Sequence, residues 1–320
     1  MSGTVRSALT KVCEFLLTAL LVSFFTFAAF SIIPGDTARV MLGPDASESQ
    51  VQSLREELGL DRSLPERYTS WLIDAFKGDF GNSLSFGSPV SGLIASRLPV
   101  TLGMSFIALI IVLIVSFPMA ALCSRKPGRI ADRTVSSLGH ILFAVPPFAL
   151  SMMLILFCSQ VLHIFTAGRY TAPSDGFGKY IGSLILPSVC IALPKIAMTF
   201  KFLRASMIEF SQGDFVRTAK SHGLSDLLIM LKHIIPNSAV SSVTVISLVL
   251  SDIMGGSLIV EQVFNLPGLG RLLLSAISRR DFPLLSGIVF YLAIITVILY
   301  FLADLISALI DPRIRDRRSA

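Results

Sequence analysis

Six long apolar runs dominate this sequence, and they fix the class of fold before any motif is considered. A transmembrane helix needs about 20 mostly apolar residues, and each run is long enough. The chain of 320 residues is 53 % hydrophobic and only 15 % charged, with a mean hydropathy of +0.74, which exceeds what a soluble core requires. We therefore expect an all-α polytopic membrane protein. Its six expected transmembrane helices are residues 12–33, 98–122, 136–162, 183–206, 237–262 and 284–310.

The Lys and Arg residues between these runs predict how the chain is oriented. Short cytoplasmic connections carry an excess of these residues. Fifteen Lys and Arg residues lie in the two terminal tails, in the connection after the second expected helix, and in or just before the connection after the fourth. Five lie in the connections after the third and the fifth expected helices. The first connection, residues 34–97, is too long to obey this rule. Both termini are therefore expected in the cytoplasm, and the net charge of +6 reflects this bias rather than a nucleic-acid surface.

The chain divides at the ends of the apolar runs. The first connection has a soluble composition, with one helix expected at residues 49–59, closed by Gly59, and another where aromatic residues recur from Tyr68 to Phe76. Either this segment packs on itself, or it is a landing surface for an extracytoplasmic partner. The expected divisions are a tail with the first helix at 1–33, an extracytoplasmic segment at 34–97, a five-helix core at 98–311 containing a polar loop at 207–236, and a cytoplasmic tail at 312–320.

The polar loop at 207–236 lies between two apolar runs. A helix is expected from Glu209 to about His222, where Gly223 allows a sharp turn at no steric cost. Ser225 is a suitable N-cap for a second short helix, and Pro236 is expected to end the loop and start the next run. A helix, a corner and a helix would suit docking into a groove of another protein. An ordinary amphipathic connector would have the same shape.

The residues of this loop resemble the cytoplasmic EAA loop of ABC importer permeases. The triplet Arg217-Thr218-Ala219 takes the place of Glu-Ala-Ala, departing from it at two positions, and Gly223 follows at the family's spacing. With the preceding Asp214, the form is similar to the dipeptide, oligopeptide and nickel branch. Further stretches resemble that branch in its order: Pro34-Gly35-Asp36, Glu57-Leu58-Gly59-Leu60-Asp61, Gly78-Asp79-Phe80-Gly81-Asn82-Ser83, Arg97-Leu98-Pro99-Val100-Thr101-Leu102, Phe264-Asn265-Leu266-Pro267-Gly268-Leu269-Gly270-Arg271, Arg280-Asp281-Phe282-Pro283 and Asp311-Pro312-Arg313-Ile314-Arg315.

This resemblance implies a fold, partners and a function. The fold is that of type I ABC importers, with six transmembrane helices and a cytoplasmic coupling helix, in a bacterial or archaeal cytoplasmic (inner) membrane. The implied partners are a second homologous permease subunit, two cytoplasmic ATPase subunits that hold ATP and Mg²⁺, and an extracytoplasmic solute-binding protein. Peptides are the expected cargo, with nickel or a metal chelate as the alternative. The residues expected to couple the chain to the ATPases are Asp214, Arg217, Thr218, Ala219, Gly223, Leu224 and Pro236.

Two ionisable residues, Lys195 and Asp252, lie inside apolar runs. A charge at such depth costs at least about 2.5–3.5 kcal/mol unless it is paired or faces water. At helical spacing, Ser247 and Ser251 share one small, polar face with Asp252. Either this face and Lys195 line a solute pathway, or small residues pack the helices closely and a neighbour such as Lys195 satisfies Asp252.

No motif in the sequence predicts bond chemistry. It contains no G-x-x-x-x-G-K-[S/T], HExxH or G-x-S-x-G motif, and its four histidines and four cysteines have no metal-ligand spacing. We therefore expect no cofactor or metal on this chain and no enzymatic activity. Two other classes of protein are the alternatives. An ion-coupled secondary transporter would explain Lys195 and Asp252 but not the loop around Gly223, and an intramembrane enzyme lacks a nucleophile or metal site.

Overall fold

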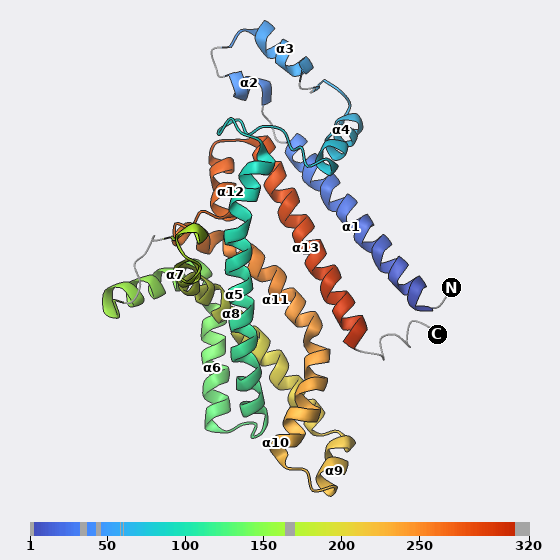
Figure 1. The fold of residues 1–320 in the computed structure, drawn as a ribbon, viewed down its shortest axis with the longest axis vertical. Helices are drawn as coiled ribbons and strands as arrows, with labels where there is room; N and C mark the ends of the chain where they lie inside the picture. The colour runs from blue at the N-terminus through green and yellow to red at the C-terminus, as the bar shows by residue number, and fades with distance from the viewer. Residues whose placement is uncertain are drawn as a thin grey trace. The chain divides into compact units, whose positions relative to one another are not determined.

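A computed structural model shows a chain built of helices (Figure 1). It describes residues 3–32, 37–42, 46–57, 59, 61–163 and 170–310. The family-like stretches at 34–36 and 311–315 and the tail at 312–320 lie outside the described residues. The chain divides into two compact units, which we describe separately. Unit 1 comprises Met1–Thr4, Val100–Pro267 and Leu299–Ala320, and unit 2 comprises Val5–Pro99 and Gly268–Ile298.

Unit 1 contains most of α5 and the helices from α6 to α11. The core lies where α5, α8 and α11 pack together, around residues such as Met104, Leu184 and Ile253. Close approach is needed here, because a Cβ on Gly103 would lie 2.8 Å from the Tyr180 hydroxyl. The helices are α5 (Val90–Ser124), α6 (Ile130–Ala144), α7 (Pro147–Leu156) with a π-turn (Phe157–Val161), α8 (Phe177–Ser211), α9 (Asp214–Ser221), α10 (Asp226–Ile229) with a π-turn (Met230–Ile234), and α11 (Ile235–Val263).

Unit 2 contains most of the long helices α1 and α13 and the helical segment after α1. Both helices expected in that segment are present: α3 ends just before Gly59, which has a φ of 63°, and α4 includes the aromatic residues. Trp71 of α4 contacts the rings of Phe27 and Phe290, so this part of the segment packs on its own unit. The helices are α1 (Gly3–Ile32), α2 (Thr37–Leu42), α3 (Glu48–Glu57), α4 (Leu64–Phe76), α12 (Leu269–Ser278) and α13 (Phe282–Ile310).

Five of the described helices are long and apolar enough to cross a membrane, namely α1, α5, α8, α11 and α13. The sixth expected helix, at 136–162, is instead a pair, α6 and α7, bent by 106°. Pro146 and Pro147 explain the break, because proline lacks an N–H donor and disfavours helical backbone in the residue before it. Val145 is accordingly extended, with φ −79° and ψ 125°. By contrast, α8 stays helical through Pro187 and Pro194.

Candidate functional site

The polar loop lies at one end of unit 1, beyond the long helices α8 and α11 (Figure 1). Its first helix is shorter than expected, because α8 continues to Ser211 and α9 begins only at Asp214. Gly213 separates them with extended backbone, φ −67° and ψ 150°. A Cβ on Gly213 would lie 2.6 Å from the Phe215 ring. The continuous helix expected from Glu209 was therefore wrong, and the packing of Phe215 is the reason that glycine stands at the break.

The corner after α9 is the one that the sequence predicts. Gly223 has a φ of 78°, a region that side chains with a Cβ rarely adopt. Its N–H donates to the carbonyl of Lys220 at 2.9 Å, and the Leu224 N–H donates to the carbonyl of Ala219 at 3.2 Å. These two bonds form a Schellman motif, which satisfies carbonyls left free at the end of α9. Three of the expected coupling residues, Ala219, Gly223 and Leu224, therefore build one rigid turn.

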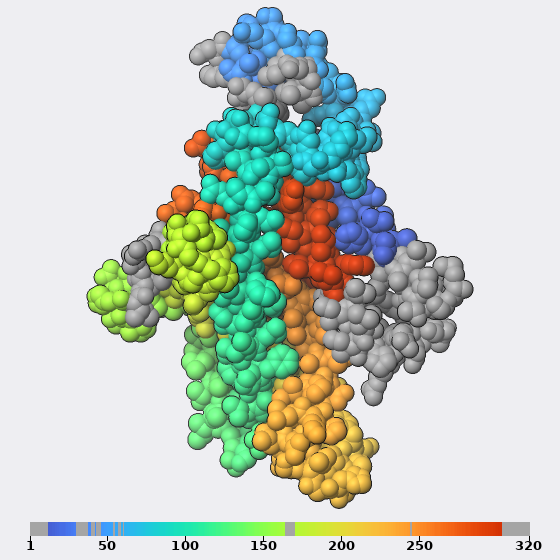
Figure 2. Space-filling model, in the orientation of Figure 1, coloured from blue at the N-terminus to red at the C-terminus, as the bar shows by residue number. Residues whose placement is uncertain are grey.

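The two faces of α9 differ in character. Val216 and Ala219 are buried in an apolar cluster with residues from α5, α8, α10 and the following π-turn. On the opposite face, the side chains of Asp214 and Arg217 are 97 % and 83 % exposed, and Thr218 is also exposed. The expected coupling residues thus divide into an anchor, Ala219, and a charged outer surface. In the space-filling view, the segment that contains α9 lies at the end of unit 1 (Figure 2).

The second half of the loop joins directly to the next long helix. Ser225 is the N-cap as expected, and its hydroxyl accepts the N–H of Leu228 at 3.4 Å. From there α10, a π-turn and α11 follow without an extended residue between them. Pro236 lies in the first turn of α11, so it stands at the end of the loop and the start of the next long helix, as expected.

Lys195 of α8 and Asp252 of α11 are brought together inside the spans. The Lys195 ammonium lies 2.9 Å from an Asp252 carboxylate oxygen, and the side chains are 20 % and 56 % exposed. Ser247 is mostly buried and its hydroxyl donates to the carbonyl of Val243, one turn earlier in α11, at 2.8 Å. Ser251 is half-buried. Of Ser247, Ser251 and Asp252, Asp252 is therefore the most exposed.

One ion pair near the loop, between Asp132 and Arg204, was not predicted from the sequence. Asp132 of α6 accepts hydrogen bonds from the Arg204 guanidinium at 2.5 and 2.6 Å, and from the Gly128 N–H at 2.7 Å. The Asp132 side chain is 4 % exposed. This pair ties the turn between α5 and α6 to the end of α8, from which the loop continues. The sequence signal for this pair was Asp132 in the first turn of a helix that follows Gly128. Its partner Arg204 is 72 residues away, so the sequence did not show the pairing.

Comparisons with known proteins agree on one family. Its model, described as binding-protein-dependent transport system inner membrane component, matches residues 116–316, and the model of its N-terminal region matches residues 5–105. A probable peptide ABC transporter permease protein of Sinorhizobium fredii is 35 % identical over 295 residues, covering 92 % of this chain and 94 % of the relative. A glutathione transport system permease protein of Escherichia coli is 32 % identical over 298 residues, covering 93 % and 95 %.

A solved structure shares the fold. A chain of the inward-facing MetNI methionine ABC transporter superposes with a TM-score of 0.56, covering 68 % of this chain and 96 % of that chain. The identity is 20 %, so this likeness concerns the fold alone.

Proposed function

This chain belongs to the family of binding-protein-dependent transport system inner membrane components, and we propose that it forms part of the path by which an ATP-driven importer takes up peptides. Membership makes it a multi-pass inner-membrane permease of the ABC importer class. The peptide cargo rests on the names of its relatives, which include a probable peptide permease and a permease for glutathione, itself a small peptide.

The proposed partners follow from the class of importer. A second, similar permease would complete the path, two ATPase subunits would bind the cytoplasmic loop, and a solute-binding protein would deliver the cargo from the other side. ATP and Mg²⁺ would be held by the ATPases. With both termini in the cytoplasm, as the Lys and Arg residues predict, the loop faces the ATPases.

The observation that carries the proposal is the two-faced helix α9. Its charged outer face offers Asp214 and Arg217 to a partner, while Val216 and Ala219 fix it to the ends of the long helices. When the ATPases close on ATP, a partner gripping this surface would move α9 as a rigid piece, because the turn at Gly223 is closed by hydrogen bonds. Closely packed helices respond to such a push by switching between discrete arrangements. The loop would thus couple ATP binding to alternating access.

The pair of Lys195 and Asp252 supports a hydrated path along α8 and α11. An ionised carboxylate that is more than half exposed inside a span does not face hydrocarbon without a large cost. Water or another subunit must therefore cover this face, as expected for a surface that lines the path. Peptides carry charged and hydrogen-bonding groups, and Ser247, Ser251, Asp252 and Lys195 are the residues proposed to lie along their route.

Reconstitution tests the proposal. The chain, its neighbouring permease, the ATPases and the binding protein are placed in proteoliposomes, and uptake of a labelled dipeptide is measured with and without ATP. We expect ATP-dependent uptake that falls at least about ten-fold with Arg217→Glu, since reversing a charge in a docked surface costs about 2 kcal/mol or more. Arg62→Glu, at an exposed position in unit 2, is the matched control and should leave docking to the ATPases unchanged.

Three results would contradict the proposal at different levels. Uptake driven by an ion gradient without ATP would overturn the importer mechanism. ATP-dependent uptake of Ni²⁺ with none of the dipeptide would overturn the cargo while leaving the machinery intact. Equal ATPase retention and uptake by the wild type and Arg217→Glu would remove α9 from the coupling surface.

A further inference from the structure

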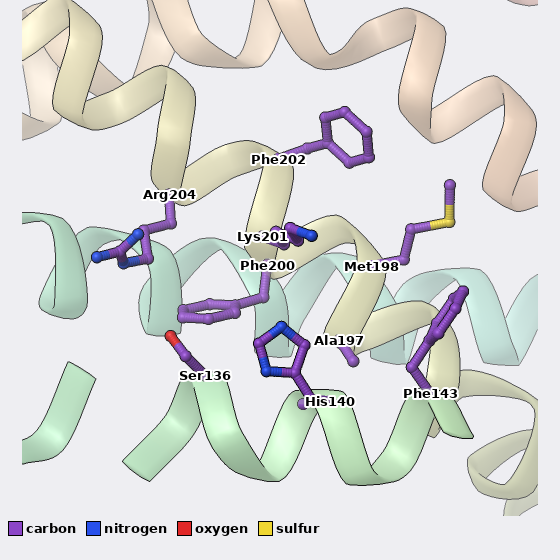
Figure 3. Close-up of a pocket in the computed structure, with 10 residues that line it drawn as sticks. Ser136, His140, Phe143, Ala197, Met198, Phe200, Lys201, Phe202 and Arg204 are labelled. Carbon is purple, nitrogen blue, oxygen red and sulfur yellow. The ribbon is translucent and has the colours of Figure 1, made fainter. Parts of the chain in front are cut away.

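A groove between α6 and α8 is not explained by transport or by coupling. It has a volume of about 450 Å³ and lies entirely within unit 1 (Figure 3). The two helices approach closely beside it, because a Cβ on Gly139 would lie 3.5 Å from the Ala197 Cβ. Its lining residues are Ser136, Gly139, His140, Phe143, Ala197, Met198, Phe200, Lys201, Phe202 and Arg204.

The groove carries positive charge without an acid of its own. No Asp or Glu is among its lining residues. The carboxylate of Asp132 balances the charge of Arg204 and accepts hydrogen bonds from Nε and Nη2 of the Arg204 guanidinium. Lys201 is exposed and forms no ion pair within the described part of the chain. The Lys201 ammonium therefore leaves the groove with an unbalanced positive charge, and His140 adds an imidazole beside it (Figure 3).

The groove also changes from polar to apolar along its length. Ser136, Lys201 and Arg204 lie toward the end of α8 that leads to the polar loop, whereas Phe143 and Met198 lie deeper in the spans (Figure 3). This end of α8 is expected at the cytoplasmic leaflet, where anionic lipid headgroups are enriched. A molecule that matches the groove therefore has an anionic head at the membrane surface and a long apolar part.

We propose that this groove is a binding site for an anionic phospholipid of the cytoplasmic leaflet. The Lys201 ammonium and the His140 imidazole would hold the phosphodiester, and an acyl chain would lie against Phe143 and Met198. Basic pockets between transmembrane helices on the cytoplasmic side are suited to such headgroups. The bound lipid would sit beside the ion pair of Asp132 and Arg204, close to the helix that carries the coupling loop.

Lipid binding to the purified full chain tests this site. Native mass spectrometry compares retention of dioleoylphosphatidylglycerol with that of dioleoylphosphatidylcholine, which has the same chains and no net charge. We expect preferential retention of phosphatidylglycerol, weakened about five-fold by Lys201→Gln, the effect of one basic residue near an anionic surface. Lys126→Gln, an exposed position in the connection between α5 and α6, is the matched control and should retain the preference. Equal retention of both lipids, or an equal effect of both substitutions, would overturn the proposal.

A second measurement locates the acyl chain. The Phe143→Trp protein is titrated with phosphatidylglycerol or phosphatidylcholine carrying brominated chains, and the fluorescence of the wild type, which has Trp71, is subtracted. We expect stronger quenching by the brominated phosphatidylglycerol, and a return to the phosphatidylcholine level when Lys201→Gln is added. Equal quenching by the two lipids would overturn the site. Displacement by soluble glycerol phosphate would show a headgroup site without a lipid. Oxidative cross-linking of Met198→Cys to a cysteine introduced into the neighbouring permease would show a subunit interface. Either result would overturn the proposal.

Discussion

The Lys195 ammonium on α8 lies 2.9 Å from the Asp252 carboxylate on α11, and more than half of the Asp252 side chain is exposed. The sequence left two separate alternatives, a pathway or a dry contact between helices. In the structure the two charges are paired, yet the Asp252 side of the pair is exposed. An open pair interacts less strongly than an enclosed one, because water screens its charges.

Asp252→Asn is expected to fold well and to impair transport. Loss of a partly solvated ion pair costs about 1 kcal/mol or less, whereas a dry pair would cost about 3–5 kcal/mol. We therefore expect near-normal amounts of folded protein after detergent extraction and reduced dipeptide uptake. Normal uptake by a well-folded Asp252→Asn protein would remove this residue from the path.

The double variant Asp252→Asn with Lys195→Met separates the two alternatives. In an open pair, each single substitution is tolerated and the double gives no recovery of folded protein. In a dry contact, each single substitution strands a charge, so both would lower the yield and the double would restore it. The wild type, both single variants and the double variant are heated, and size-exclusion chromatography then measures how much folded protein each retains.

The buried pair of Asp132 and Arg204 should contribute far more to stability than Lys195 and Asp252. Asp132→Ala leaves the Arg204 guanidinium and the Gly128 N–H without their acceptor in a largely enclosed place. Breaking a buried pair typically costs about 3–5 kcal/mol. We expect a clear fall in the unfolding temperature and weaker retention of the ATPases, since this pair holds the end of α8 from which the loop continues.

The exposed pair of Arg39 and Glu48 supplies the control, with side chains 50 % and 84 % exposed. Glu48→Ala should change the unfolding temperature little. Asp132→Ala combined with Arg204→Met should recover much of the lost stability, because no charge is then stranded. If Asp132→Ala proved as harmless as Glu48→Ala, the proposed brace at the end of α8 would be wrong.

Local chemistry explains which parts of the loop could be predicted from sequence. The corner at Gly223 and the cap at Ser225 depend on residues within a few positions, so their signals are complete in a short stretch. The break at Gly213 depends on where the Phe215 ring packs, and that ring lies against His233 in the π-turn after α10. The partner of Asp132 likewise lies on another helix. Such contacts form only when the helices have packed together, so the spacing of residues in the sequence does not predict them.

The long helices were predictable for a related reason. A run of about 20 apolar residues signals a span by itself, and five of the described helices meet that test. The bend of 106° between α6 and α7 was not, because Pro146 and Pro147 can either kink a helix or end it. Tandem prolines and the extended backbone of Val145 select the second outcome.

A buried carboxylate in unit 2 should stabilise the family-like stretches around it. Asp281 is fully buried and accepts the Ser83 hydroxyl at 2.5 Å and the Ser85 N–H at 2.9 Å. Asp281→Ala leaves each donor without this acceptor, at a cost of about 1–3 kcal/mol per donor. We expect faster proteolysis of the 78–90 stretch in the purified protein. Asp79→Ala, which removes an acceptor from the Gly81 N–H in an exposed turn, should have a much smaller effect.

Orientation can be tested directly with single cysteines in intact cells. Ser49 of α3 and Ser225 of the loop are both exposed, so either position is open to a reagent on its own side of the membrane. If both termini are cytoplasmic, a membrane-impermeant maleimide should label Ser49→Cys but not Ser225→Cys until the cells are opened. Wild-type protein gives the background from the native cysteines. Labelling of Ser225→Cys alone in intact cells would invert the topology and end the coupling proposal.

The turn at Gly223 offers the sharpest test of coupling, because its requirement is conformational rather than steric. No atom lies within 4 Å of a Cβ built there, but the φ of 78° strains residues with side chains. A β-branched residue is strained by about 1–3 kcal/mol in this region, whereas Asn adopts it more readily. We expect Gly223→Val to stay in the membrane but to lose ATPase co-purification and ATP-dependent dipeptide uptake, and Gly223→Asn to keep most of both. If Gly223→Val docked the ATPases and transported as well as Gly223→Asn, the rigid Schellman turn would have no part in transmitting their movement.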